Sequence, residues 1–149
     1  MDTTHLPTFL AIAVRDWFSE THPVQRLWRI CDAMELWTKY VATVGLAARV
    51  REAGGRLPRD LALRLAGTIE RPTFGFWVRM AEAVLPGIGG ASDFLSRGTA
   101  LFLEARALLT PGPASPPEKG ILYLRNYLAH GGGLTLVAGQ RLLEEEGHQ

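Results

Sequence analysis

Apolar residues recur three and four positions apart along most of the chain, which is the spacing of one face of an α-helix. The first such segment covers residues 8–19 and ends at the His22-Pro23 break, where the proline suits the first turn of a following helix. Its apolar stripe consists of Phe9, Ile12, Ala13 and Trp17. The second segment, residues 24–50, is apolar on most sides, which predicts a long helix at the centre of a bundle.

Glycines and prolines divide the rest of the chain into further helical segments. The pattern predicts helices at residues 57–69, 74–85, 91–109 and 118–130, with a last short helix at 134–146. No run alternates with the period of a strand, and no segment repeats at the period of a solenoid. The sequence therefore predicts an all-α helical bundle of about five to seven helices with one long central helix.

Length and composition are typical of one globular domain with its own core: 149 residues, of which 47% are hydrophobic. We therefore expect a single domain over residues 1–149. The last residues, LLEEEGHQ, look like a helix with nothing yet to pack on. The sequence leaves open whether they are a true C-terminus or the point at which a larger protein continues beyond this N-terminal module.

Composition also excludes several classes of protein. No apolar run reaches the ~18 residues of a membrane-spanning helix, and no basic segment followed by an apolar one marks a secretory signal. Cys31 is the only cysteine, and its apolar helical surroundings predict a buried thiol in a reducing, cytoplasmic setting. The net charge of +1 gives no overall basic field of the kind that marks strong nonspecific DNA binders. We expect no metal and no cofactor, because no cysteine–histidine cluster has the spacing of a zinc site.

Candidate chemistry concentrates in LRNYLAHGGG, residues 124–133. Arg125 and His130 are residue types that suit RNA cleavage without a metal. A histidine with a pKa near neutral moves the proton of the attacking 2′-hydroxyl, and an arginine holds the phosphate oxygens as charge builds on them. Asn126 is placed to orient the phosphate or the histidine, and Gly131–Gly133 let the backbone approach a ligand closely.

Ideal helical geometry does not bring Arg125 and His130 together. Five residues along an α-helix separate two side chains by roughly 140° around the axis and ~7.5 Å along it. Convergence therefore requires the helix to loosen at His130, which the three following glycines favour, or a second copy of the chain to supply the missing group.

The segment resembles the RNA-cleaving motif of the HEPN superfamily, in which an arginine is followed after four to six residues by a histidine, often with a polar residue directly after the arginine. Arg125, Asn126 and His130 match this motif, and the AHG ending is also similar. The resemblance implies an all-α domain that cleaves RNA without a metal and forms a homodimer in which two motifs face one cleft. It also implies a toxin with an antitoxin partner, or a module with additional domains in a larger antiviral defence protein. Some members of the superfamily lack activity and serve in binding or dimerisation.

Arg15–His22 and Arg141–His148 also fit the motif of an arginine followed after four to six residues by a histidine. The first histidine precedes a proline between helices, and the second lies near the chain end, so we expect both to be solvated. For Arg125 and His130 the alternative is a surface arginine and a histidine whose charge suits a helix C-terminus.

Other residues near the motif leave alternatives open. Tyr123 and Tyr127 stand one turn apart, and either stack on the bases of single-stranded RNA or pack against the bundle. Glu35 on the long helix either forms an ordinary ion pair with Lys39, four residues on, or orients the motif's arginine or histidine. Asp32, on the same helix, has the same two alternatives, an ordinary ion pair or a role in orienting the motif. The tryptophans at positions 17, 28, 37 and 77 are expected in the core or a dimer interface.

Two hypotheses follow from the sequence. In the first, the chain is a HEPN-type ribonuclease acting on RNA as a homodimer, with Arg125 and His130 as catalytic residues and Asn126 and Tyr127 as substrate contacts. In the second, it is a non-catalytic helical module that dimerises or docks a partner within a larger defence or signalling protein. The low net charge favours the second, and the sequence context of the motif favours the first.

Overall fold

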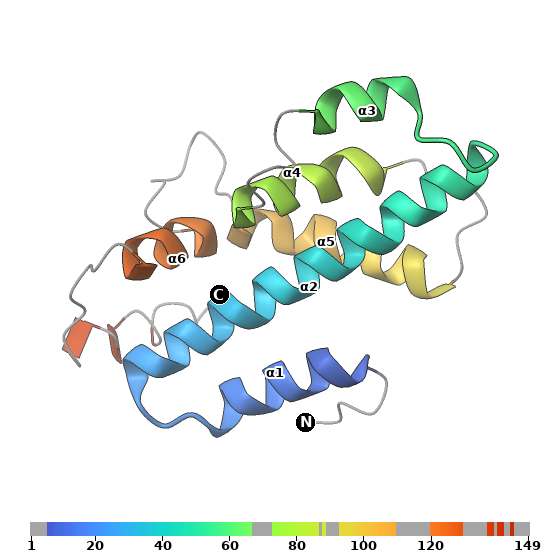
Figure 1. Cartoon of the computed structure of the whole chain (residues 1–149). Helices are drawn as coiled ribbons and strands as arrows, with labels where there is room; N and C mark the ends of the chain where they lie inside the picture. The colour runs from blue at the N-terminus through green and yellow to red at the C-terminus, as the bar shows by residue number, and fades with distance from the viewer. Residues whose placement is uncertain are drawn as a thin grey trace.

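The structure is a computed structural model that describes residues 6–66, 73–86, 88, 93–109, 120–129, 137–138, 140–141 and 144. Helices and no strands are found in these residues (Figure 1). The helices with defined bounds are α1 (Thr8–Ser19), α2 (Pro23–Glu52), α3 (Arg59–Leu65), α4 (Phe74–Val84), α5 (Asp93–Leu109) and α6 (Ile121–Ala129). The predicted all-α bundle is therefore confirmed. The last predicted helix, at 134–146, falls only partly within the described residues, and those that are described are helical.

The 30 residues of α2 form the long central helix that the sequence predicts. Pro23 occupies its first turn, and His22 caps it by accepting a backbone N–H of that turn through Nδ1 at 3.5 Å. At the other end, Gly54 and Gly55 have φ values of 70° and 90°, which residues with a Cβ rarely adopt. The Gly55 N–H donates to the Val50 carbonyl at 2.8 Å, so the glycine pair ends the helix.

The core surrounds α2. In Figure 1, α1 lies along one side of α2, and α4, α5 and α6 cover its other sides. α4 packs against α2 most extensively, and Gly45 makes this approach possible, because a Cβ at that position would lie 2.8 Å from Val84 Cγ2. The largest fully buried side chains include Leu27, Val41, Phe74, Val78, Val84, Phe102 and Leu109. Trp28, Trp37 and Trp77 are partly buried against this cluster, which confirms a core position for three of the four tryptophans.

Two predicted details are wrong. The third helix ends at Leu65 and not near residue 69, because the backbone of Ala66 is extended, with ψ of 135°. The first helix does not bury the predicted stripe, since Phe9 and Ile12 are exposed and Leu10 is its buried residue. Leu10, Val14 and Trp17 of α1, together with Leu6 before the helix, line a groove between α1, α2 and α5, and they follow the same three-to-four spacing in a different register.

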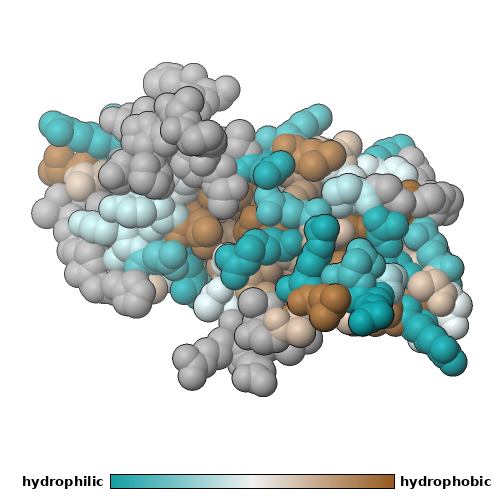
Figure 2. Space-filling view, turned by 90° about the horizontal axis from the view of Figure 1, so that it is seen from above, coloured by the Kyte–Doolittle hydropathy of each residue, from teal (hydrophilic) through white to brown (hydrophobic). Residues whose placement is uncertain are grey.

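The surface mixes polar and apolar side chains. Figure 2, seen from above, presents a face on which hydrophilic side chains dominate and apolar side chains form patches between them. Within the described part of the chain, no helix combines the length and the apolarity needed to cross a lipid bilayer.

Candidate functional site

Arg125 lies on α6, and the packing of that helix sets its position. Ile121 and Leu128 are buried on the inner face of α6, and this face contacts α2 and α5. Arg125 therefore stands beside α2, where its Nε donates a hydrogen bond to Glu35 Oε2 at 3.1 Å. The two residues are 90 positions apart in the chain, so this contact depends on the tertiary fold.

Glu35 connects Arg125 to a second cation. Lys39, one turn along α2, places its Nζ 2.8 Å from Glu35 Oε1, which confirms the predicted i,i+4 ion pair. The Glu35 side chain is 13% exposed, compared with 35% for Arg125 and 39% for Lys39. A carboxylate this shielded by protein needs its charge paired, and each of its oxygens meets one cation. Both sequence alternatives for Glu35 thus hold in geometric terms, because the same carboxylate forms an ion pair and fixes Arg125.

The contact with Glu35 leaves part of the Arg125 guanidinium available. Only Nε is engaged by a described residue, and the two Nη groups have no hydrogen-bond partner among the residues that the structure describes. An arginine held through Nε keeps its plane fixed while its Nη groups can donate in the parallel geometry that a phosphate accepts. The arrangement suits a pre-oriented anion-binding group at the surface.

Two titratable residues on α2, Cys31 and Asp32, have pKa values that respond to burial and to the charge of Arg125. Burial raises the pKa of the Cys31 thiol from 9.0 to about 12, Asp32 adds to the rise, and the Arg125 charge opposes it. Partial loss of solvent raises the pKa of Asp32 as well, with Arg29 as the main opposing charge. Cys31 is therefore protonated near neutral pH and is no nucleophile, as the sequence predicts for a buried thiol. The charge of Arg125 reaches both groups, which places it beside the N-terminal half of α2.

The other predicted substrate contacts lie on the outer side of α6. Asn126 is exposed, and the rings of Tyr123 and Tyr127 stack on each other with centroids 6.2 Å apart and an interplanar angle of 19°. Both tyrosines are exposed, so they belong to the surface and not to the core of the bundle. A stacked, exposed aromatic pair is a platform on which a base can stack, and here it projects from the side of α6 away from Arg125, because each tyrosine is two positions from that residue.

The structure brings together only part of the predicted motif. Arg125, Asn126 and Tyr127 share one helix, whereas His130 and the glycines after it lie outside the described residues. In the competing match, His22 is exposed and its Nδ1 caps α2, which gives it a structural task. Arg15 is paired with its neighbour Asp16 at 3.6 Å. His148 of the third match also lies outside the described residues.

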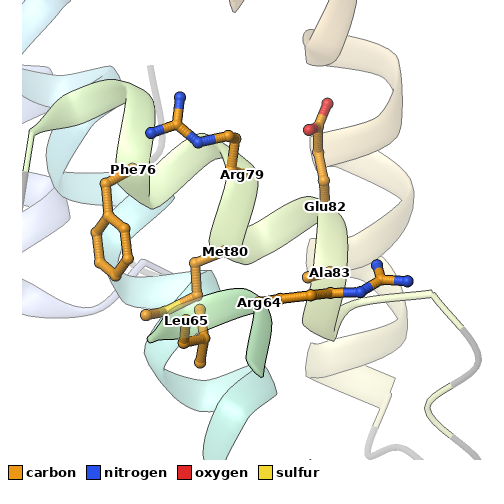
Figure 3. Close-up of a pocket in the computed structure, with 7 residues that line it drawn as sticks. All are labelled: Arg64, Leu65, Phe76, Arg79, Met80, Glu82 and Ala83. Atoms are coloured by element: carbon orange, nitrogen blue, oxygen red, sulfur yellow. The ribbon is translucent and has the colours of Figure 1, made fainter. Parts of the chain in front are cut away.

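A second feature, which sequence reasoning missed, is a pocket of about 350 Å³ between α3 and α4. Figure 3 shows Leu65, Phe76 and Met80 converging on its floor, with the side chains of Arg64 and Arg79 extending away from it. Neither arginine has an ion pair within the described residues. No motif marks them in the sequence, where they are two of many scattered arginines.

Arg79 reaches back along α4 toward α6. Its Nη1 and a methyl group of Leu122 each lie 3.6 Å from the position that a Cβ would take on Gly75. The guanidinium is therefore no more than twice that distance from α6, one turn before Arg125. This is a second described cation near the motif helix.

Among the residues that the structure describes, no three histidine, cysteine, aspartate or glutamate side chains gather as they would to hold a metal ion. Comparisons of the chain with protein-family models, with curated proteins and with solved structures found no match. The functional conclusion therefore depends on the residues of this chain.

Proposed function

We propose that this chain is a metal-independent endoribonuclease of HEPN type, which cleaves RNA as a homodimer in a toxin or antiviral-defence setting in the cytoplasm. The observation that carries the proposal is Arg125, fixed through Nε by the shielded Glu35 carboxylate with its Nη groups turned to no described partner. The exposed tyrosine stack on the other side of the same helix adds an aromatic surface on which a base can stack.

In the proposed reaction the RNA supplies its own nucleophile. His130 accepts the proton of the ribose 2′-hydroxyl, whose oxygen forms a bond to the adjacent phosphorus. Arg125 donates to the phosphate oxygens, which gain negative charge as the bond forms. The bond from phosphorus to the 5′-oxygen then breaks, and that oxygen takes up a proton. The products are a 2′,3′-cyclic phosphate and a 5′-hydroxyl end, with no water or metal consumed.

Glu35 is a positioning residue in this scheme, since it acts on RNA only through Arg125. Asn126 and Tyr127 contact the substrate, and Arg79 offers a second phosphate contact on the neighbouring helix. An antitoxin or additional domains would control when the site acts.

The test is cleavage of a mixed RNA substrate in EDTA by the wild type and by single variants. We expect cutting by the wild type that leaves 2′,3′-cyclic phosphate ends, and its loss by at least about a hundredfold in His130→Ala and Arg125→Ala. His22→Ala is the matched control, because His22 is an exposed histidine at the same kind of spacing whose task is to cap α2. It should cut like the wild type.

Glu35→Gln separates positioning from general stability. The variant keeps the shape of the side chain and removes the charge that fixes Arg125. We therefore expect a lower rate of RNA cleavage, because Arg125 then binds the RNA phosphate less tightly. Circular dichroism of each variant shows whether it is folded. A folded wild type that leaves all RNA intact would refute the free-standing nuclease and favour the non-catalytic interaction module.

A further inference from the structure

The pocket between α3 and α4 combines an apolar floor with a charged rim. Leu65, Phe76 and Met80 form the floor. The volume of about 350 Å³ lies at the small end of the roughly 300–1,000 Å³ that ligand sites occupy. An apolar floor with a few polar groups around it is the usual lining of such a site. The pocket therefore suits a single ligand group, and the charges at its rim indicate which kind.

The charges at the rim favour an anion. Arg64, Arg79 and Glu82 are the charged residues that line the pocket. The Glu82 carboxylate is paired, because Arg106 Nε lies 2.8 Å from its Oε1. Arg64 and Arg79 are both exposed, and neither has an ion pair within the described residues. The pocket therefore presents two available cations to a ligand and no unpaired carboxylate.

The surface beside the pocket is basic as well. In residues 51–66, which include α3, the charged side chains are Arg51, Arg56, Arg59 and Arg64 against Glu52 and Asp60. The Glu52 carboxylate is itself paired with Arg49 at 3.7 Å. The whole chain has a net charge of only +1, so positive charge is concentrated in this region. A local field of this sign attracts a polyanion even though the net charge of the protein is low.

The two available arginines are separated by the floor. Figure 3 shows their side chains leaving it in different directions, Arg79 from α4 and Arg64 from α3. A single strand of nucleic acid has a phosphate on each side of every base, so its charges match two separated cations while the base covers the apolar floor. A compact anion would use only one of the arginines and would leave the floor in water.

Arg79 also connects the pocket to the Arg125 site. Its Nη1 and a methyl group of Leu122 on α6 each lie 3.6 Å from the position of a Cβ on Gly75. Arg125 follows Leu122 by one turn of the same helix. A strand whose phosphate meets Arg125 therefore reaches the pocket by passing Arg79.

We propose that the pocket between α3 and α4 holds one base of the RNA strand, near the bond that is cleaved, while Arg64 and Arg79 bind the phosphates on either side of that base. The inference rests on the proposed function for RNA as the ligand. Phosphate contacts position a strand without reading its sequence, whereas a base inside a shaped pocket is selected. The pocket is therefore a specificity-determining site that does not touch the reacting atoms.

Binding is measured apart from cleavage with labelled RNA oligonucleotides whose 2′-O-methyl groups remove the nucleophile. Fluorescence anisotropy with the full chain at several salt concentrations gives the affinity and its salt dependence. Arg64→Ala and Arg79→Ala should each weaken binding and reduce the slope of log affinity against log salt by about 0.7, the value for one phosphate contact on a single strand. Arg15→Ala is the matched control, because Arg15 is an exposed arginine on α1 that is paired with Asp16. Its slope should equal that of the wild type.

Ala83→Phe tests the base, because Ala83 lines the pocket and a larger side chain there fills it without changing a charge. The wild type should prefer one of three oligonucleotides made of A, C or U. The variant should bind the preferred one about tenfold more weakly and lose the preference, with the salt slope unchanged.

Equal affinity of the wild type for all three oligonucleotides, or an Arg64→Ala variant that binds like Arg15→Ala, would overturn the pocket proposal even if the protein cleaves RNA. A free mononucleotide that binds as tightly as the strand would overturn it too, because the pocket would then be a site for a small ligand. Pocket-dependent binding by a wild type that leaves unmodified RNA intact would support the base site and refute the nuclease. If Ala83→Phe does not fold, the two variants at the exposed arginines decide the outcome.

Discussion

At the scale of single residues, Cys31 lies in an environment very different from that of the unfolded chain. It is fully buried on α2, and burial raises the pKa of its thiol from 9.0 to about 12. The folded chain therefore keeps the thiol proton at a pH where the unfolded chain has lost it. A folded-state pKa above the unfolded value contributes stability that is complete below pH 9 and is lost as the pH rises toward 12.

We predict that the wild type loses stability relative to Cys31→Ala between pH 9 and pH 11. The limiting slope is about 1.4 kcal/mol per pH unit in the free energy of unfolding. Urea unfolding at pH 7.5 and at several values above pH 9 measures it, and tyrosine and lysine titration cancels because both proteins share it. Parallel pH profiles for the two proteins would contradict a buried thiol that stays protonated.

At the scale of elements, two glycines lie where α2 is in contact with a neighbouring helix, Gly45 facing α4 and Gly98 facing α2. A Cβ on Gly45 would lie 2.8 Å from Val84 Cγ2 and 3.0 Å from Leu85 Cδ2, so α4 would have to move. A Cβ on Gly98 of α5 would meet only Val41 Cγ1, at an ordinary contact distance of 3.6 Å. An added methyl group is therefore too close to its neighbours at Gly45 and fits at Gly98, although both glycines lie within helices.

We predict opposite effects for alanine at these two glycines. Gly98→Ala should raise the free energy of unfolding by about 0.5–1 kcal/mol, because alanine is the better helix former and meets no obstacle. Gly45→Ala should lower it, because a cost of about 1–3 kcal/mol for overpacking exceeds the same helical gain. Chemical denaturation of both variants beside the wild type tests the difference. Equal effects would show that α4 yields to a methyl group at residue 45.

The sequence predicts elements better than it predicts their contacts. Helical apolar spacing and the breaks at Pro23 and Gly54-Gly55 define α1 and α2 to within about two residues at each end, because these signals are local. The register of α1 is mispredicted because several apolar stripes are available on a short apolar helix, and packing selects Leu10 over Ile12. The contact of Arg125 with Glu35 spans 90 positions, and nothing local encodes which carboxylate a distant arginine meets.

At the scale of the whole molecule, α2 separates the Arg125 site from an apolar groove of about 310 Å³ between α1, α2 and α5. Glu35, which fixes Arg125, and Trp37, which lines the groove, are two positions apart on the helix. Two positions correspond to roughly 200° around the axis, so the residues point to opposite flanks of α2. A change within the groove is therefore expected to leave the Arg125 site intact.

This arrangement predicts that RNA cleavage tolerates a change in the groove. Leu101→Asp should leave the rate of RNA cleavage per chain within about twofold of the wild type, because Leu101 lines the groove and Arg125 lies on the other flank of α2. Cleavage assays of both proteins at equal concentration provide the measurement, with Leu63→Asp as the surface control. A drop of tenfold or more in a folded Leu101→Asp variant alone would mean that the groove takes part in cleavage.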